Sequence, residues 1–178
     1  MAEIPRRVVL VGFMGSGKSC VGPELARLLG WRFEDMDRRI EERLGATVAQ
    51  VFESSGEAFF RAEEKRLAEE LAHLESVVIA AGGGAFASAE TREALQAGSL
   101  TVWLRCDLDT VLSRVPLDGS RPLARDRETI TRLFSEREPS YRLANRAVDA
   151  SSGTPVAVAK EIAAMLPSVP GVGRTKSR

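Results

Sequence analysis

A run of eight residues near the N-terminus has the composition of a phosphate-binding loop. Residues 12–19 read Gly-Phe-Met-Gly-Ser-Gly-Lys-Ser and match the pattern G-x-x-x-x-G-K-S in full, after an apolar stretch and before a segment of helical periodicity. The glycines let the backbone turn so that its N–H groups and the positive end of the next helix bind phosphate. We expect Lys18 to reach the β- and γ-phosphate oxygens and the Ser19 hydroxyl to bind Mg²⁺. The residues expected to contact the nucleotide here are Gly12, Gly15, Ser16, Gly17, Lys18, Ser19 and Cys20.

Two carboxylates lie two residues apart at the end of the second apolar segment. Asp35 and Asp37 flank Met36, and in an extended chain residues two apart project to the same side. Both carboxylates are therefore expected to face the phosphates. Phosphoryl transfer needs one carboxylate that holds Mg²⁺, directly or through water, and one that orients the attacking hydroxyl or accepts its proton. Two solvated acids at the start of a helix are the alternative explanation.

Three consecutive glycines, Gly82, Gly83 and Gly84, follow an apolar strand at the end where open α/β sheets bind ligands. Their backbone can approach a ligand closely and donate N–H groups to it. Elsewhere, Arg61 follows two phenylalanines, and Glu64 lies three residues further along the same expected helix. Such an arginine can clamp a carboxylate while the glutamate holds it in place, although the sequence alone favours a surface arginine.

Residues 116–128 interrupt the pattern with turn-forming residues and three arginines but no sustained apolar period. A long exposed loop in a compact domain is often a lid, and a lid arginine can close over a transferring phosphate while water is excluded. A connection without a function is the alternative. Arg121, Arg125 and Arg127 all lie in this loop, and physical reasoning alone does not choose among them.

Apolar runs of strand length alternate with segments of helical period, which predicts an α/β fold with a parallel sheet covered by helices on both faces. Thr154 and Pro155 predict the start of a last helix that reaches Leu166, and another long helix is expected after Gly56. We expect one domain over residues 1–166, with a lid at 116–128 and a disordered tail at 167–178. The expected strands are Arg7–Val11, Arg32–Asp35, Ser76–Ala81, Leu100–Arg105 and Arg146–Ala150.

The composition restricts the possible partners and settings. Apolar residues make up 44% and charged residues 28%, and 25 basic residues balance 25 acidic ones, so no overall positive field attracts nucleic acid or an anionic membrane. The apolar run at residues 8–11 is too short for a signal peptide or a membrane span. Cys20 and Cys106 do not form a disulfide framework, so we expect a reducing cytoplasm, with Cys20 as a small buried apolar side chain. The absence of a heptad seam predicts a monomer.

The motifs described above, together with two further segments and in their order along the chain, resemble the shikimate kinase family of small P-loop enzymes. That family is related to the nucleoside monophosphate kinases. The resemblance implies a three-layer α/β/α P-loop fold with a lid and a five-stranded parallel sheet in the order 2-3-1-4-5. It also implies phosphorylation of the 3-hydroxyl of shikimate by ATP with one Mg²⁺ ion, in chorismate and aromatic amino-acid biosynthesis. The match covers about residues 7–166, and the segments that carry it are 12–19, 35–37, 51–61, 82–84, 121–123 and 139–142.

The same resemblance implies a role for particular residues. Asp37 would assist the attack of the acceptor hydroxyl, Lys18 and Arg121 would stabilise the transferring phosphoryl group, and Asp35 would serve Mg²⁺ through water beside Ser19. Arg114 and the segment around Pro155 would flank the adenine. Cys20 stands where the family more often has Thr, which we expect to be tolerated because the Ser19 hydroxyl remains. An acceptor-binding region at about residues 37–61 and elsewhere would supply Asp37, Phe52, Phe60, Arg61, Gly82, Gly83, Gly84 and Arg142, with Arg61 and Arg142 binding the carboxylate.

Three other functions are compatible with a P-loop. A gluconate kinase would share the fold, and although Arg61 and Arg142 suit a rigid carboxylate in a closed pocket, gluconate is also an acid. A nucleotide-binding regulator that has lost catalysis would be expected to lack Asp37 or Arg121, and both are present. A GTPase would be expected to carry an Asn-Lys-x-Asp type segment that reads guanine, and we find none.

Overall fold

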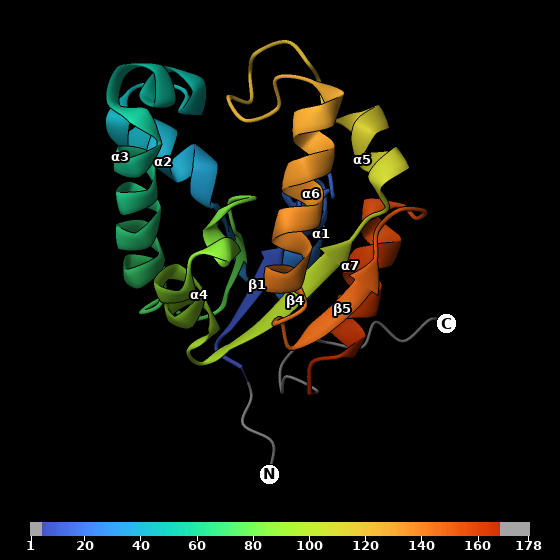
Figure 1. Cartoon of the computed structure of the whole chain (residues 1–178). Coiled ribbons are helices and arrows are strands. Elements are labelled where there is room, and N and C mark those ends of the chain that lie inside the picture. The colour runs from blue at the N-terminus through green and yellow to red at the C-terminus, as the bar shows by residue number, and fades with distance from the viewer. Residues whose placement is uncertain (1–4, 168–178) are drawn as a thin grey trace.

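The strands form a single parallel sheet. Within residues 5–167, which the computed structural model describes, the five strands pair in the order β2-β3-β1-β4-β5, and every neighbouring pair is parallel (Figure 1). This order confirms the expected topology. The tail expected at 167–178 falls, from residue 168 onward, outside the described residues. The strands are β1 (Arg7–Val11), β2 (Arg32–Asp35), β3 (Val77–Ala80), β4 (Ser99–Arg105) and β5 (Arg146–Asp149).

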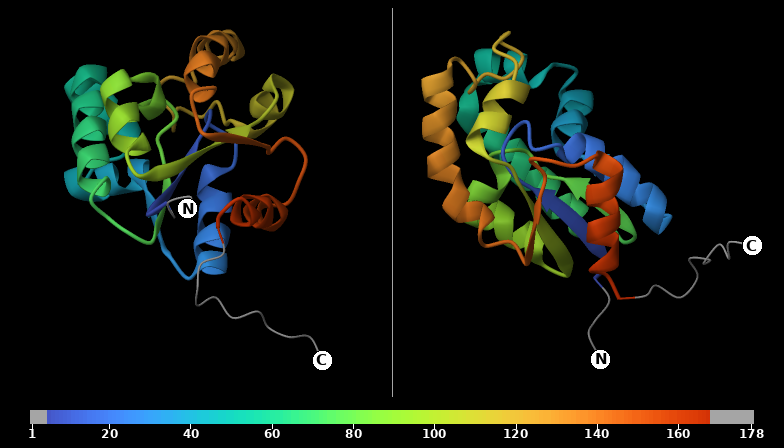
Figure 2. Two further views of the ribbon diagram at one scale, coloured as in Figure 1. Left: turned by 90° about the horizontal axis from the view of Figure 1, so that it is seen from below. Right: turned by 90° about the vertical axis from the view of Figure 1, so that its right-hand side faces the viewer.

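Helices cover both faces of the sheet, as Figure 2 shows. One face packs against α1 and α7, and the other packs against α3, α4 and α6. Alternate side chains of β1 point to opposite faces of the sheet. Val8 and Leu10 belong to the core beneath α1 and α7, and Val9 and Val11 belong to the core beneath α3, α4 and α6. The helices are α1 (Lys18–Leu29), α2 (Met36–Leu44), α3 (Val48–Leu71), α4 (Ala89–Gln96), α5 (Leu108–Arg114), α6 (Arg127–Tyr141) and α7 (Pro155–Ala164), with a short 3₁₀ helix, η1 (Ala85–Ala87).

Local capping explains where the helices begin. Asp35 caps α2, Thr47 caps α3 in a reciprocal arrangement with Gln50, and Thr154 caps α7 with Pro155 in its first turn. The start of the last helix is therefore as expected, although it ends at Ala164 and not at Leu166. None of the helices within residues 5–167 is both long and apolar enough to cross a membrane.

The long helix α3 consists of two helical parts that meet at Gly56, and the second part is the long helix expected after that glycine. Gly56 lies inside α3 with φ 84° and ψ 169°, a conformation that other residues rarely adopt, and the helix changes direction there. Arg61 and Glu64 lie in this second part, after the kink.

Two further expectations about local structure were wrong. The loop expected at 116–128 ends at Asp126, whose side chain accepts a hydrogen bond from the backbone N of Thr129 at 2.7 Å and so starts α6 at Arg127. Cys20 is exposed and not buried, because the buried face of α1 consists of its neighbours Val21, Gly22, Leu25, Ala26 and Leu29.

Candidate active site

The loop between β1 and α1 has the backbone that its glycines predict. Gly12 has a φ of 149° and Gly15 a φ of 78°, and a methyl group on Gly12 would lie 2.8 Å from the carbonyl oxygen of Leu104. Lys18 bends back over this loop, where its Nζ donates hydrogen bonds to the carbonyl oxygens of Gly12 at 2.7 Å and Phe13 at 2.9 Å. The ammonium is thus held above the concave side of a phosphate-binding loop.

The pKa of Lys18 is lowered to about 8. Burial is the largest cause, and the positive charges of Arg121 and Arg137 act in the same direction, whereas Asp37 and Asp35 raise it. An anion bound in the loop would favour the charged form of Lys18. The loop therefore favours a bound anion, since Asp35 and Asp37 only partly offset the effect of burial on Lys18.

Asp35 connects the loop to α2. Its Oδ2 accepts a hydrogen bond from the Ser19 hydroxyl at 2.6 Å, and its Oδ1 accepts from the backbone N of Asp37 at 3.1 Å and of Arg38 at 3.3 Å. The two aspartates therefore belong to a helix cap and its first turn, and the expected explanation from an extended chain was wrong. The hydroxyl of Ser19 and the carboxylate of Asp35 are hard oxygen ligands of the type that Mg²⁺ prefers.

Asp37 is half-buried between the loop and the end of β3. Burial and the negative charge of Asp35 raise its pKa, while Lys18 and Arg121 lower it. A methyl group on Gly82 would lie 2.8 Å from Oδ1 of Asp37 and 2.5 Å from Oε1 of Glu64. Only a glycine at this strand end leaves room for both carboxylates.

Arg61 and Glu64 form the opposite wall. Nη1 of Arg61 lies 2.5 Å from Oε2 of Glu64, and the Arg61 guanidinium also contacts Glu57 at 3.2 Å. A methyl group on Gly84 would lie 2.5 Å from the same Nη1 atom. Burial raises the pKa of Glu64 and the positive charge of Arg61 acts against this. The glycine loop thus lets an arginine and its carboxylate partner approach the end of the sheet.

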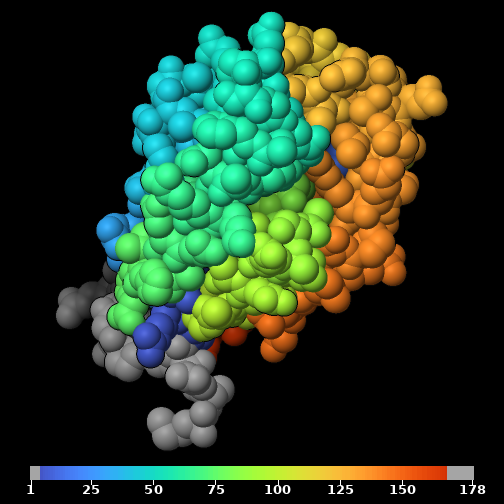
Figure 3. Space-filling model, turned by 60° about the vertical axis from the view of Figure 1, so that its left-hand side comes forward, coloured from blue at the N-terminus to red at the C-terminus, as the bar shows by residue number. Residues whose placement is uncertain are grey.

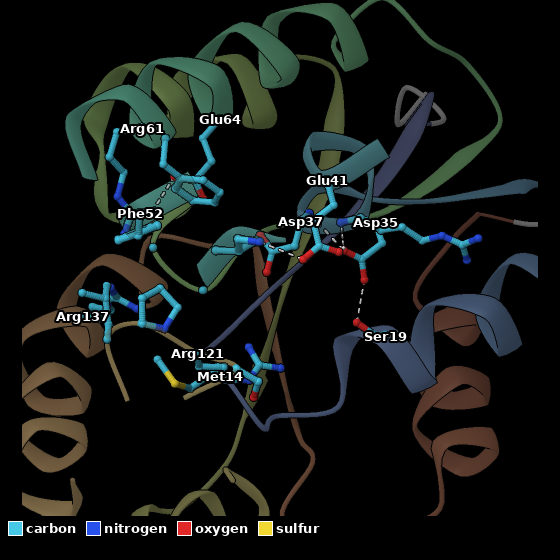
Figure 4. A pocket seen from close by; sticks show the side chains of 18 residues that line it. Met14, Ser19, Asp35, Asp37, Glu41, Phe52, Arg61, Glu64, Arg121 and Arg137 are labelled. Atoms are coloured by element: carbon cyan, nitrogen blue, oxygen red, sulfur yellow. Dashed lines mark hydrogen bonds and ion pairs between the residues drawn. The ribbon is translucent and has the colours of Figure 1, made fainter. Parts of the chain in front are cut away.

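A cavity of about 320 Å³ separates these walls, and we call it the Arg61 pocket. In Figure 4 Asp35 and Asp37 lie on the α2 side, Arg61 and Glu64 on the α3 side, and Arg121 beside Met14 below them. Figure 3 shows a narrow hollow between the surfaces of α3 and α6. Besides the residues labelled in Figure 4, Phe60, Gly83, Gly84, Pro122 and Leu123 are among the lining residues.

A second cavity of about 330 Å³, which we call the P-loop pocket, lies over residues 14–21. Arg114 and Pro155 also line it, and the Arg114 guanidinium donates hydrogen bonds to the carbonyl oxygens of Gly15 at 3.4 Å, Ala150 at 3.2 Å and Ser151 at 3.1 Å. The two pockets adjoin each other, because six residues line both. These shared residues are Met14, Ser19, Asp35, Asp37, Gly83 and Arg121.

Of the three loop arginines, the structure brings Arg121 to the site, where it lines both pockets. Arg125 and Arg127 are exposed and line neither, and Arg127 belongs to the first turn of α6. Of the residues expected from the family resemblance, Phe52 and Phe60 also line the Arg61 pocket, with ring centroids 4.9 Å apart.

Arg142 is an expected site residue that the structure places away from the site. Its side chain is 68% exposed and pairs with Glu138 at 2.8 Å on the surface, because it follows the last turn of α6. Arg137 on the same helix does line the Arg61 pocket: it is 8% exposed, and its Cζ lies 5.8 Å from the centre of the Phe13 ring.

A sequence signal for Arg137 existed. Arg137 lies seven residues after Ile130 and four before Tyr141, and these three are the buried residues of α6. An arginine at a position of the apolar face of a helix has to find a partner in the interior or a ligand. The motif Pro-Ser-Tyr-Arg at residues 139–142 indicated Arg142. The two arginines differ in their position on α6, because Arg137 lies on its buried face and Arg142 follows its last turn.

A phosphate-binding pocket that shares two carboxylates and an arginine with a second pocket is the arrangement of a P-loop kinase. The sequence profile of the shikimate kinase family matches residues 14–167. The shikimate kinase of Moorella thermoacetica is 45% identical over 161 residues, which cover 89% of this chain and 93% of that protein. The chain belongs to the shikimate kinase family and is a phosphotransferase.

Solved structures agree with this assignment. Shikimate kinase from Acinetobacter baumannii, solved in complex with shikimate, has a TM-score of 0.87 at 35% identity and covers 90% of this chain and 92% of that one. A gluconokinase from Sinorhizobium meliloti has a TM-score of 0.57 at 19% identity, with 92% and 96% of the two chains covered, and so shares the fold alone.

Proposed function

We propose that this kinase transfers the γ-phosphoryl group of ATP to the 3-hydroxyl of shikimate, which gives shikimate 3-phosphate and ADP. The observation that carries the proposal is that Asp37 and Arg121 line both the P-loop pocket and the Arg61 pocket. A donor phosphate in one pocket and an acceptor hydroxyl in the other would meet at these two side chains. The similar structure from A. baumannii holds shikimate, which supports this choice of acceptor.

The P-loop pocket would hold ATP. The loop backbone and Lys18 suit the phosphates, because Lys18 lies against the carbonyl oxygens of Gly12 and Phe13 and can turn toward an anion. Arg114 and Pro155, which line the same pocket, would flank the adenine. The proposed nucleotide contacts are Gly12, Gly15, Ser16, Gly17, Lys18, Ser19, Cys20, Arg114, Arg121 and Pro155.

The Arg61 pocket would hold shikimate. Arg61 and Arg137 both line it, and two guanidinium groups suit a carboxylate that accepts paired hydrogen bonds. Glu64 holds one of them in place. Arg137 replaces Arg142 in this proposal. The other proposed contacts are Asp37, Phe52, Phe60, Gly82, Gly83 and Gly84.

In the proposed transfer, Asp37 accepts the proton of the 3-hydroxyl while the hydroxyl oxygen bonds to the γ-phosphorus. The bond from that phosphorus to the β,γ-bridging oxygen breaks, and ADP leaves with the electron pair. The raised pKa of Asp37 suits a base that must take up this proton. Lys18 and Arg121 stabilise the charge on the transferring group.

Ser19 and, through water, Asp35 are the groups that would hold one Mg²⁺ ion. When bound with ATP, Mg²⁺ neutralises charge on the β- and γ-phosphate oxygens. Asp35 would serve the ion through Oδ2, which here accepts a hydrogen bond from the Ser19 hydroxyl, because its Oδ1 caps α2. Substitution of Asp35 is thus expected to disturb α2, and with it Asp37, as well as the ion.

The segment from residue 116 to 126 would act as a lid. Ser120, Arg121, Pro122 and Leu123 line the Arg61 pocket, so closure of this segment would exclude water from the transfer. We further propose a monomer that works in the cytoplasm in chorismate and aromatic amino-acid biosynthesis. The free thiols of Cys20 and Cys106 suit a reducing compartment.

The experiment that tests this function is a coupled assay of ADP release with MgATP and one of three additions: shikimate, gluconate or no acceptor. We expect turnover with shikimate alone. Turnover with gluconate alone would assign the chain a different acceptor, and ATP binding without turnover in all three cases would favour a regulator that has lost catalysis.

A further inference from the structure

Tyr141 is a buried residue in the last turn of α6 that none of the proposed steps uses. It is 2% exposed and packs beside Trp103, with ring centroids 6.2 Å apart. Its hydroxyl donates a hydrogen bond to the carbonyl oxygen of Gly83. A phenylalanine would fill the same apolar space without that hydroxyl, so packing alone does not explain a tyrosine at this position.

Gly83 fixes where the phenol hydrogen points. The carbonyl of Gly83 belongs to the glycine loop that lines both pockets, and its acceptance of the phenol hydrogen leaves the phenol oxygen free to accept another bond. A methyl group on Gly83 would lie 3.6 Å from Nη1 of Arg137. The phenol oxygen, the glycine loop and the Arg137 guanidinium therefore meet at one point at the end of the sheet.

The effect of Arg137 on the phenol agrees with this geometry. Burial raises the pKa of Tyr141 to about 12, while the nearby positive charge of Arg137 lowers it. The phenol consequently stays protonated at neutral pH. It can accept a hydrogen bond from Arg137 and donate one to Gly83 at the same time.

Phe13 restrains the other side of the guanidinium. The Cζ atom of Arg137 lies 5.8 Å from the centre of the Phe13 ring, and that ring packs edge-on against Phe134 at 5.4 Å. Neither ring can direct the N–H groups of Arg137, because a ring face attracts a cation without choosing among its donors. The phenol oxygen of Tyr141 can, because it is a hydrogen-bond acceptor.

We propose that Tyr141 is a positioning residue for the carboxylate of the acceptor and acts by orienting Arg137. This inference rests on the proposed function, since it assumes a carboxylate in the Arg61 pocket. With one guanidinium donor occupied by the phenol, the remaining donors of Arg137 face the pocket, where they bind the carboxylate. Loss of the hydroxyl leaves Arg137 in the pocket but lets its donors turn away.

The test compares the wild type with Tyr141→Phe on two acceptors, shikimate and its uncharged carboxamide. We expect the KM for shikimate to rise about tenfold, as for loss of one hydrogen bond that involves a charged group. The KM for the carboxamide and that for ATP are expected to stay within about twofold, because neither depends on an oriented Arg137. The preference for shikimate over the carboxamide should thus fall about tenfold.

Thr101→Val is the matched control. The Thr101 hydroxyl donates to Oδ1 of Asn145 at 2.8 Å, it is buried, and neither residue lines the two pockets. This variant loses a buried hydroxyl as Tyr141→Phe does, so it should lower the stability and leave the preference between the acceptors unchanged. A fall in preference in both variants would overturn the inference, since it would then follow from lost stability.

A double-mutant cycle supplies the second measurement. In an Arg137→Lys background, Tyr141→Phe should have no further effect on the KM for shikimate, because the orientation it removes is already lost. Additive effects, or an unchanged preference in Tyr141→Phe while the wild type turns over shikimate, would overturn the inference alone. A wild type that does not phosphorylate shikimate would overturn the proposed function and this inference with it.

Discussion

Arg61 and Glu64 form an ion pair of 2.5 Å that closes one wall of the Arg61 pocket, one helical turn apart on α3. The two sides of the pair are unequal, since Glu64 is 2% exposed whereas the side chain of Arg61 is 27% exposed. The positive charge of Arg61 stabilises the buried carboxylate of Glu64, while the more exposed guanidinium of Arg61 still has N–H groups that can bind a ligand. The pair therefore contributes to stability and to binding in ways that can be separated.

Arg61→Ala should lower the free energy of unfolding by about 2 kcal/mol, because it leaves the buried Glu64 carboxylate without its cation. It should also raise the KM for shikimate by more than about tenfold with little change in the KM for ATP. The double variant Arg61→Ala, Glu64→Gln should recover much of the stability and none of the affinity. Denaturant unfolding and steady-state kinetics measure the two effects, and a recovery of both together would contradict the carboxylate role of Arg61.

Asp37→Asn should reduce kcat by about a hundredfold to ten-thousandfold, since the amide cannot accept the hydroxyl proton. The Kd for ATP should change little, as measured by calorimetry. Asp109→Asn on the exposed surface of α5 is the control and should leave kcat unchanged. Normal turnover by Asp37→Asn would remove this residue from the mechanism.

The lowered pKa of Lys18 predicts a dependence on pH. The free enzyme should lose the Lys18 proton as the pH rises through about 8, well below the ordinary value of 10.5, and kcat/KM for ATP should fall above that pH. Because bound phosphates favour the ammonium form, ATP binding at a pH just above 8 should take up protons. Calorimetry in two buffers of different ionisation enthalpy measures the uptake, which Lys18→Met should abolish. Equal proton uptake by the wild type and Lys18→Met would assign it to another group.

Arg137→Ala and Arg142→Ala form a matched pair on the same helix. Arg137 lines the Arg61 pocket, so its loss should raise the KM for shikimate by more than about tenfold, whereas Arg142 pairs only with Glu138 at the surface and its loss should change the KM by less than twofold, or about 0.4 kcal/mol. Steady-state kinetics with saturating ATP decide between them. The opposite order would restore Arg142 to the site.

Gly22 allows α1 to pack closely against Phe33, so a larger residue there is expected to lower the stability of the fold. A methyl group there would lie 2.1 Å from the ring of Phe33, so Gly22→Ala should lower the free energy of unfolding by about 1–3 kcal/mol. The midpoint of thermal unfolding measures this loss. Gly153→Ala is a control for stability, because its methyl group would make an ordinary contact of 3.6 Å with Val158. Equal midpoints for the two variants would contradict the packing of Phe33 against α1.

The sheet and the phosphate-binding loop were predictable from the sequence because each depends on neighbouring residues. Apolar runs such as Val8–Val11 mark strands that are buried on both faces, and the glycines and Lys18 of the loop form one contiguous motif. The order of the strands required the family resemblance, since periodicity does not specify which strands are neighbours.

The features that the sequence did not predict depend on the register of a helix, on the backbone conformation of a single residue, or on which side chain caps a helix. Whether Arg137 or Arg142 faces the pocket depends on which face of α6 packs against Phe13, and the motif at 139–142 carries no information about that face. The kink at Gly56 requires a single positive φ within a segment of otherwise helical sequence. Asp126 ends the loop because its side chain caps α6, as Asp35 caps α2, whereas Asp118 within the same loop caps no helix.

The central claim is that the γ-phosphoryl group passes from ATP to shikimate at the junction of the two pockets. The direct measurement follows ATP labelled in its γ-phosphoryl group, with shikimate as the acceptor and phosphorus NMR to identify the product. We predict that the label appears on the 3-hydroxyl oxygen of shikimate with the wild type and is lost from that product with Asp37→Asn. Label released as inorganic phosphate by the wild type, with shikimate unmodified, would contradict the claim.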